Sequence, residues 1–170
     1  AGAEPGGPIV IFDDDHYYMG GVLAELLKKR GLDVTIVTPA ADVSNWTHNT
    51  LEQGRIQSRL MKMGVKILAN HVMEAVGKDA ATVRCIYTEN TCEIPCKTFV
   101  PVTMRLPVDD LYYALIAQAP HAQVTRIGDC FAPGTIAAAV YSGHRYAREL
   151  GAPPTDDVPF RRELPHLAAE

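Results

Sequence analysis

Apolar and polar residues occur along the chain in blocks that predict alternating strands and helices. Residues 8–12, PIVIF, form a short continuous apolar run, which is typical of a strand buried on both faces of a parallel sheet. Residues 17–30 place apolar side chains at helical spacing and end in a basic turn before Gly31, as a helix C-terminus does. A β-branched strand over 33–40 follows at once. The beginning of the chain is therefore predicted to form a β-α-β unit.

The α/β alternation continues beyond this unit and is interrupted once by short strands. The pattern predicts a helix over 50–64, a strand over 65–70, short strands over 71–76, 82–88 and 97–104 with turns near 77–81 and 89–93, a helix over 109–119, a strand over 123–129 and an Ala-rich helix over 135–151. We expect an α/β fold, a Rossmann-like three-layer domain of the dinucleotide-binding type with a small antiparallel β excursion.

Composition limits the classes of protein to consider. The chain has 170 residues, 47% of them hydrophobic, which is enough for one globular domain or two small lobes. The formal net charge is −4, so no basic surface indicates binding to nucleic acid or to an anionic membrane. No apolar run reaches the roughly 18 residues needed to cross a bilayer, and no signal peptide is recognisable. We expect a soluble, cytoplasmic protein.

The four cysteines and the two ends of the chain suggest no chemistry of their own. Cys92 and Cys96 form a CxxxC pair, but no histidine or second cysteine pair flanks it at zinc spacing, so we expect free thiols and no metal site. Residues 1–7 have the Pro/Gly composition of a linker and lack an initiator methionine, which suggests a piece of a longer protein. Residues 152–170 are predicted to be a C-terminal tail that packs loosely or against a part that is absent from this chain.

The turn after the first predicted strand carries three aspartates, Asp13, Asp14 and Asp15. A β-α-β unit binds a dinucleotide when this turn is glycine-rich, because the backbone must approach the pyrophosphate closely at a helix N-terminus. Gly20 matches the third glycine of that fingerprint and is its remnant, whereas the aspartates replace the first two. A carboxylate about 4 Å from a phosphate charge costs about 4 kcal/mol at an effective dielectric of 20. We therefore expect no bound pyrophosphate there.

Two other interpretations give the aspartates a role. Paired acidic residues after a strand hold Mg²⁺ in bacterial receiver domains, but the phosphoacceptor aspartate is missing, because Glu52 and Arg55 occupy that region within a predicted helix. The favoured interpretation is that the aspartates cap the following helix, where carboxylates contribute about 0.3–1 kcal/mol each. No residue of the chain is predicted to be catalytic.

Several long segments resemble one protein family. Residues 9–31, 34–40, 45–65 and 126–151 are similar to the C-terminal part of the trimethylamine dehydrogenase group, which includes dimethylamine and histamine dehydrogenases, 2,4-dienoyl-CoA reductase and other NADH:flavin oxidoreductases. The resemblance extends from about residue 8 to about residue 160. It implies a parent oxidoreductase with an Old Yellow Enzyme-like barrel that carries FMN and a [4Fe–4S] cluster, followed by a domain for FAD or ADP.

The resemblance also implies how this chain is divided. A linker over 1–7 would precede an NAD(P)-binding-like inserted domain over 8–104, a returning segment of the FAD/ADP-binding-like domain over 105–151 and the tail over 152–170. The N-terminal barrel of the same polypeptide is the implied partner. The parent is expected to form a homo-oligomer and to pass electrons to an electron-transferring flavoprotein. The chain alone is expected to bind no cofactor and to be inactive.

Gly128 and Asp129 match the GD motif of flavoproteins with two dinucleotide-binding domains. The resemblance implies that the Asp129 carboxylate accepts hydrogen bonds from a ribitol or ribose hydroxyl, although Asp129 is also a suitable turn or N-cap residue. The 13–15 turn departs from NADPH-binding members and favours an amine dehydrogenase-like parent with a degenerate nucleotide site. The alternative is a functional NAD(P)H-binding domain that feeds electrons to a flavin. The parent's substrate stays open.

Overall fold

The computed structural model describes residues 5–152, and the chain divides into two compact units between Met104 and Arg105. We call residues up to Met104 unit 1 and those from Arg105 onward unit 2. Only residues 5–7 of the predicted linker and only Ala152 of the predicted tail are described, so the rest of both segments lies outside the described residues. Each unit is described by itself.

Most of the predicted elements are present, with shifted ends. Unit 1 contains β1 (Ile9–Asp13), α1 (Met19–Lys29), β2 (Val34–Thr38), the short 3₁₀ helix η1 (Asn45–His48), α2 (Gln53–Lys62), β3 (Lys66–Ala69), β4 (His71–Val76), β5 (Ala80–Cys85), β6 (Thr91–Pro95) and β7 (Thr98–Val102). Unit 2 contains α3 (Asp110–Gln118), the 3₁₀ turn η2 (Gly128–Cys130) and α4 (Ile136–Glu149). Within residues 5–152, each helix is too short or too polar to cross a lipid bilayer.

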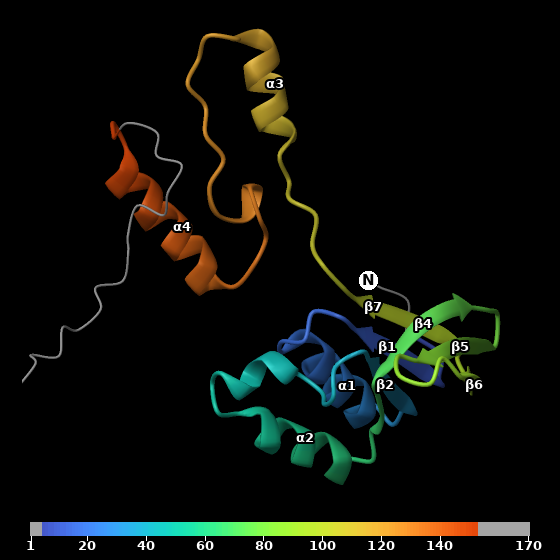
Figure 1. Ribbon diagram of the computed structural model, residues 1–170. Helices are drawn as coiled ribbons and strands as arrows, with labels where there is room; N and C mark the ends of the chain where they lie inside the picture. Colours follow the sequence, from blue (N-terminus) through green and yellow to red (C-terminus); the bar gives the residue numbers. More distant parts are fainter. Residues whose placement is uncertain (1–4, 153–170) are drawn as a thin grey trace, which may run out of the picture. The chain divides into compact units, whose positions relative to one another are not determined.

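Unit 1 is built on a parallel sheet with the strand order β3-β2-β1-β7. Val10 pairs with Thr35 of β2 on one side and with Phe99 of β7 on the other, so β1 is a central strand. At the end of the ladder, Asp13 lies opposite Val102. The helices α1 and α2 connect these strands and lie side by side (Figure 1). The carboxyl ends of the strands therefore meet at one edge.

The parallel sheet is the middle of three layers. Alternate residues of a strand face opposite sides, and here both sides are apolar because both are covered. Ile9 and Ile11 pack with Ala24 and Leu27 of α1 in one core cluster. Val10 packs in a second cluster that includes residues of the antiparallel sheet β4-β5-β6, among them Val83. The predicted three-layer α/β fold with a small antiparallel sheet is confirmed.

Two predictions within the short strands were wrong. The strand expected over 97–104 was assigned to the antiparallel excursion, whereas β7 is a parallel strand next to β1. A turn was expected near 89–93, but β6 begins at Thr91 and pairs antiparallel with β5. Sequence pattern does not identify a strand's neighbour, because the neighbour is selected by long-range packing.

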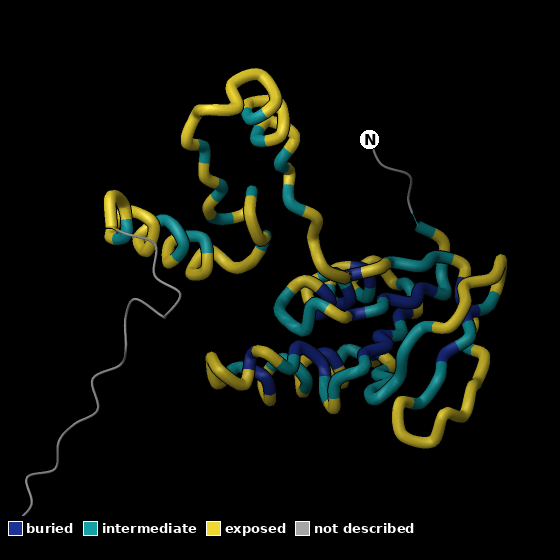
Figure 2. The backbone as a smooth tube through the Cα atoms, turned by 45° about the horizontal axis from the view of Figure 1, so that its top comes forward, coloured by how far each residue is buried: buried dark blue, intermediate teal, exposed yellow. Residues whose placement is uncertain are grey.

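Unit 2 contains two helices without a buried face. None of the residues of α3 or α4 is buried, and Figure 2 shows the dark blue of buried backbone only in unit 1. Leu106, Leu111 and Ile136 are 72–89% exposed. The strand expected over 123–129 is absent, which is a third correction. A strand needs a hydrogen-bonded neighbour, and the described part of unit 2 contains no other strand to supply one.

We predict that Ile36→Ala destabilises unit 1 strongly. Ile36 lies in the middle of β2 and is fully buried, so its truncation leaves a cavity that costs about 2–5 kcal/mol. Urea unfolding followed by circular dichroism measures the loss. Met61→Ala is the control, because Met61 is 62% exposed on α2 and should change stability by no more than about 0.5 kcal/mol. Equal losses in both variants would contradict the layer arrangement.

Candidate functional site

The carboxyl ends of β1, β2 and β7 form the edge where an open α/β sheet binds its ligand. The turn of residues 14–18 follows β1 and leads into α1, and the loop with η1 follows β2. We use the name crevice only for this set of residues, namely 13–20, Thr38, Trp46 and Val102, which lie at or next to this edge. Its atoms determine whether the nucleotide site predicted to be degenerate retains the means to bind a phosphate.

The backbone N–H groups of the turn donate hydrogen bonds to the protein itself. Asp14 N–H and Asp15 N–H both donate to the carbonyl oxygen of Val102, at 2.8 and 3.1 Å. His16 N–H donates to Asp13 Oδ1 at 3.1 Å. In a dinucleotide-binding turn, such N–H groups point at the pyrophosphate. Here three successive donors are already used.

The two loops at this edge are also joined to each other. Trp46 N–H donates to the carbonyl oxygen of His16 at 2.9 Å. The His16 backbone is in the left-handed region, with φ 58°, and its ring lies with Nδ1 3.4 Å from Thr38 Oγ1 and Nε2 3.5 Å from Asp14 Oδ1. His16 therefore links the ends of β1 and β2 through both its backbone and its ring.

Asp13 is fully buried at the end of β1. Burial raises the pKa of its carboxyl above the ordinary value of 3.8, and the hydrogen bond from His16 N–H offsets only part of that effect. The Oδ2 atom is shielded from solvent and has no hydrogen-bond partner among the described residues. A carboxyl in this environment is destabilised when it is ionised.

The interpretation that the aspartates cap α1 was wrong. The helix begins at Met19 with Tyr18 at the N-cap position, and it has no side-chain cap hydrogen bond. The Asp13 carboxyl accepts a hydrogen bond from His16 N–H instead. It does not cap the helix, because β1 extends through Asp13 and residues 14–18 separate it from the start of α1. Gly20 is buried in the first turn of α1.

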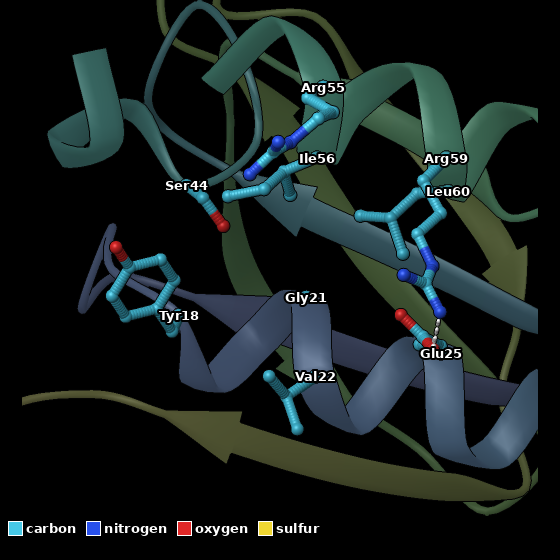
Figure 3. A pocket seen from close by; sticks show the side chains of 9 residues that line it. All are labelled: Tyr18, Gly21, Val22, Glu25, Ser44, Arg55, Ile56, Arg59 and Leu60. Atoms are coloured by element: carbon cyan, nitrogen blue, oxygen red, sulfur yellow. Dashed lines mark hydrogen bonds and ion pairs between the residues drawn. The ribbon is translucent and has the colours of Figure 1, made fainter. Parts of the chain in front are cut away.

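A pocket of about 400 Å³ lies between α1 and α2 beside the loop after β2, and Figure 3 shows its lining side chains. The Arg59 guanidinium donates to Glu25 Oε1 at 2.5 Å, and Arg55 Nη2 lies 3.6 Å from Glu52 Oε1. The Tyr18 hydroxyl also donates to the Glu52 carboxylate, and this contact raises the pKa of Tyr18. Both arginines of the pocket thus already face carboxylates.

Gly128 and Asp129, the residues of the predicted GD motif, lie in η2 of unit 2. Gly128 has φ 60°, a left-handed conformation that glycine adopts readily, and its N–H donates to Ser142 Oγ of α4 at 3.0 Å. Asp129 Oδ1 accepts from Gly134 N–H at 3.3 Å, while Thr135 is the residue that caps α4. Asp129 is exposed and has a turn role here, and its predicted contact with a cofactor hydroxyl stays a prediction.

The cysteines are free thiols, with Cys96 buried and Cys92 exposed. Residues 5–152 contain no group of three or more His, Cys, Asp or Glu side chains arranged to hold a metal ion. Cys96 packs in the core cluster between the two sheets, and burial raises the pKa of its thiol. The CxxxC spacing therefore corresponds to one core residue and one surface residue.

Sequence reasoning missed two residues of the crevice. Val102 contributes a backbone carbonyl oxygen, a group that every residue carries, and its position depends on β7 being the neighbour of β1. Trp46 contributes a backbone N–H in the same way. Every residue carries a backbone carbonyl group, so residue type could not identify this one. Only the correct assignment of β7 to the parallel sheet could have located Val102.

Comparisons with known proteins agree on one family. Residues 2–94 match the family described as the OYE-like second alpha/beta domain. Dimethylamine dehydrogenase from Hyphomicrobium sp. (strain x) is 29% identical over 93% of this chain. The structure of histamine dehydrogenase from Rhizobium sp. 4-9 is 46% identical over 94% of this chain, with a TM-score of 0.83.

A third relative is also similar to most of this chain and is itself much longer. The structure of 6-hydroxypseudooxynicotine amine oxidase from Pseudomonas geniculata N1 is 35% identical over 88% of this chain, with a TM-score of 0.80. The matches cover 25%, 26% and 23% of the dimethylamine dehydrogenase, the histamine dehydrogenase and the amine oxidase. The chain thus spans about a quarter of the length of each of these relatives.

We predict that Asp13→Asn changes stability in a pH-dependent way. The pKa of Asp13 is higher in the folded chain than in the unfolded chain, so its favourable contribution is complete below 3.8 and is lost as the pH rises through the folded pKa. Asparagine has nearly the shape of the protonated acid and carries no charge. The variant should match the wild type at acid pH and exceed it at neutral pH.

Urea unfolding of both chains at several pH values between acid and neutral conditions measures this difference. The wild type at acid pH is the internal control, because the two side chains are then both neutral. A stability difference that stays constant across the whole range would show that ionisation of Asp13 carries no cost, contrary to its burial.

Proposed function

Because the chain belongs to the family of OYE-like second alpha/beta domains, we propose that it is the rear part of a longer oxidoreductase of the amine dehydrogenase type. In this proposal unit 1 is a structural domain of the nucleotide-binding type whose own NAD(P) site is degenerate. Unit 2 is the returning segment of a domain that binds FAD or ADP.

The observation that carries this proposal is the use of the turn's donors inside the protein. Asp14, Asp15 and His16 donate their N–H groups to Val102 and Asp13, so a pyrophosphate would find none of these three donors free. The carboxylates of the turn also repel a phosphate charge. The end of β2, Thr38, offers neither the carboxylate that binds a ribose in NAD sites nor the arginine of NADP sites.

The exposed helices of unit 2 support its assignment as the returning segment of another domain. Apolar side chains such as Leu111 and Ile136 are exposed on helices that have no buried residue, as expected when a further layer of the same polypeptide covers them. The extended segment before Gly128 would then pair with strands of that layer. In this arrangement Gly128 and Asp129 would lie at the end of a strand, where a GD motif approaches a flavin or ADP ribose.

The proposed parent has further parts and partners. In this proposal FMN and a [4Fe–4S] cluster belong to the N-terminal barrel of the parent. We expect the parent to be a cytoplasmic homo-oligomer that passes electrons to an electron-transferring flavoprotein. The substrate class is a small amine, as the names of dimethylamine dehydrogenase and histamine dehydrogenase indicate for those relatives.

We predict that NADH, NADPH and ADP do not bind to the crevice of the wild-type chain. Amide signals of residues 13–21 in ¹⁵N-labelled protein should stay in place during titration with each nucleotide, because the N–H groups of Asp14, Asp15 and His16 already donate within the protein and the carboxylates of the turn repel a phosphate. Signals of unit 2 are the control, since ADP binding at Gly128 would move them without involving the crevice. Movement of the 13–21 signals by NADPH would favour a functional NAD(P)H-binding domain instead.

We predict that the chain alone does not oxidise amines. With dimethylamine or histamine as substrate and an artificial electron acceptor, the turnover should equal the rate without protein, because no residue of the chain is assigned to catalysis and the flavin belongs to the barrel. Histamine dehydrogenase assayed in parallel is the positive control. Protein-dependent turnover by the 170-residue chain would overturn this assignment.

A further inference from the structure

Helix α1 carries apolar side chains on a flank that is open to solvent. Met19, Leu23 and Leu26 recur at the spacing that places side chains on one face of a helix, and we call these three residues the α1 flank. Met19 and Leu26 are 46% and 43% exposed, and Leu23 is half-buried. A surface helix needs one apolar stripe to pack on its sheet, and the buried Ala24 and Leu27 already supply it. The second stripe therefore indicates a second contact.

The α1 flank is turned away from α2 and toward β7. Gly21 and Glu25 face α2, since a Cβ atom on residue 21 would lie 3.6 Å from Ile56 Cγ2 and Glu25 Oε1 accepts from Arg59 (Figure 3). At about 100° per residue, these two positions and the α1 flank lie on roughly opposite sides of the helix axis. The sheet order is β3-β2-β1-β7, with α1 after β1 and α2 after β2. The side of α1 opposite α2 is thus the side of β7.

The same face of β7 is also apolar. Val100 pairs with Ile11 of β1, and residues that pair directly have their side chains on one face of the sheet. Val100 is half-buried against the core cluster that contains Ile11. Residues 5–104 contain two α-helices, and both connect strands that lie on the other side of β7 from the edge of the sheet. We call the α1 flank together with Val100 the β7-side surface.

The chain enters unit 1 over this face. Thr98 pairs with Ile9, so its side chain lies on the same face of the sheet as that of Val100. The Thr98 hydroxyl donates to the carbonyl oxygen of Gly6 at 2.7 Å. The polypeptide that leads into β1 is therefore held on the α1 side of β7. Only five residues precede Gly6 in this chain, and they span at most about 17 Å when extended.

We propose that the β7-side surface binds an amphipathic helix formed by the parent polypeptide directly upstream of residue 1. The inference rests on the proposed function, in which the chain is the rear part of a longer oxidoreductase, and it adds the surface by which the preceding part holds unit 1. A helix fits because the layer on this side of the sheet consists of helices, which pack side by side about 8–10 Å apart. Its apolar residues would face Leu26 and Val100.

The first test compares the 170-residue chain with a longer chain that adds about 20 upstream residues of the parent, enough for a helix of average length and its connection. Leu26→Glu should lower the urea midpoint roughly twice as much or more in the longer chain, because Leu26 is then buried. Met61→Glu is the matched control, since Met61 is 62% exposed on α2 and should have the same small effect in both chains. If Leu26→Glu does not fold, Leu26→Ser replaces it. Equal effects of the Leu26 substitution in both chains would overturn the proposal.

The second test identifies the occupant by the methyl signals of Met19 and Leu26. These signals should differ between the longer chain and the 170-residue chain, while the methyl signal of Met61 stays in place. In the 170-residue chain they should not move on dilution. Movement on dilution would assign the β7-side surface to a second copy of the chain and overturn the proposal, as would identical signals in the two chains.

The outcomes also separate this inference from the proposed function. A coding sequence without an upstream polypeptide would overturn the assignment to a longer oxidoreductase, and this inference with it. An upstream polypeptide that leaves the effect of Leu26→Glu unchanged would overturn the docking surface alone. Binding of NADPH to residues 13–21 would overturn the degenerate site and leave the docking surface standing.

Discussion

The carbonyl oxygen of Val102 accepts two hydrogen bonds from the turn between β1 and α1, and the rest of the crevice depends on this contact. Because Asp14 and Asp15 both donate to it, the turn lies against the end of β7. His16 is thereby placed where its N–H reaches the Asp13 carboxyl and its carbonyl oxygen accepts from Trp46. The result is a strand–turn–helix unit in which the N–H groups of Asp14, Asp15 and His16 are satisfied within the protein.

Burial of Asp13 offsets part of the free energy that these hydrogen bonds contribute to folding. A buried carboxyl with one unpartnered oxygen is costly when ionised, and its raised pKa expresses that cost. Unit 1 can tolerate the cost because two apolar clusters, one on each face of the parallel sheet, hold β1 in place. The core thus supports a costly polar arrangement at the edge of the sheet.

Much of the fold could be predicted from sequence, because local patterns determine it. The apolar run before Asp13, the helical spacing before Gly31 and the short strands after residue 70 all correspond to observed elements. The neighbour of β1 could not be predicted, since β7 joins the parallel sheet by long-range packing, and the carbonyl of Val102 was missed with it. The strand predicted over 123–129 is absent because a strand needs a hydrogen-bonded neighbour, and the described part of unit 2 contains no other strand.

The central claim is that the backbone donors of the turn are used inside the protein, and amide hydrogen exchange of the wild-type chain tests it most directly. The account predicts that the N–H groups of Asp14 and Asp15 exchange slowly, with protection comparable to that of the β1 ladder, because both donate to Val102. Exchange of these two amides at the rate of an unstructured loop would contradict it, since free donors would still be available to a phosphate.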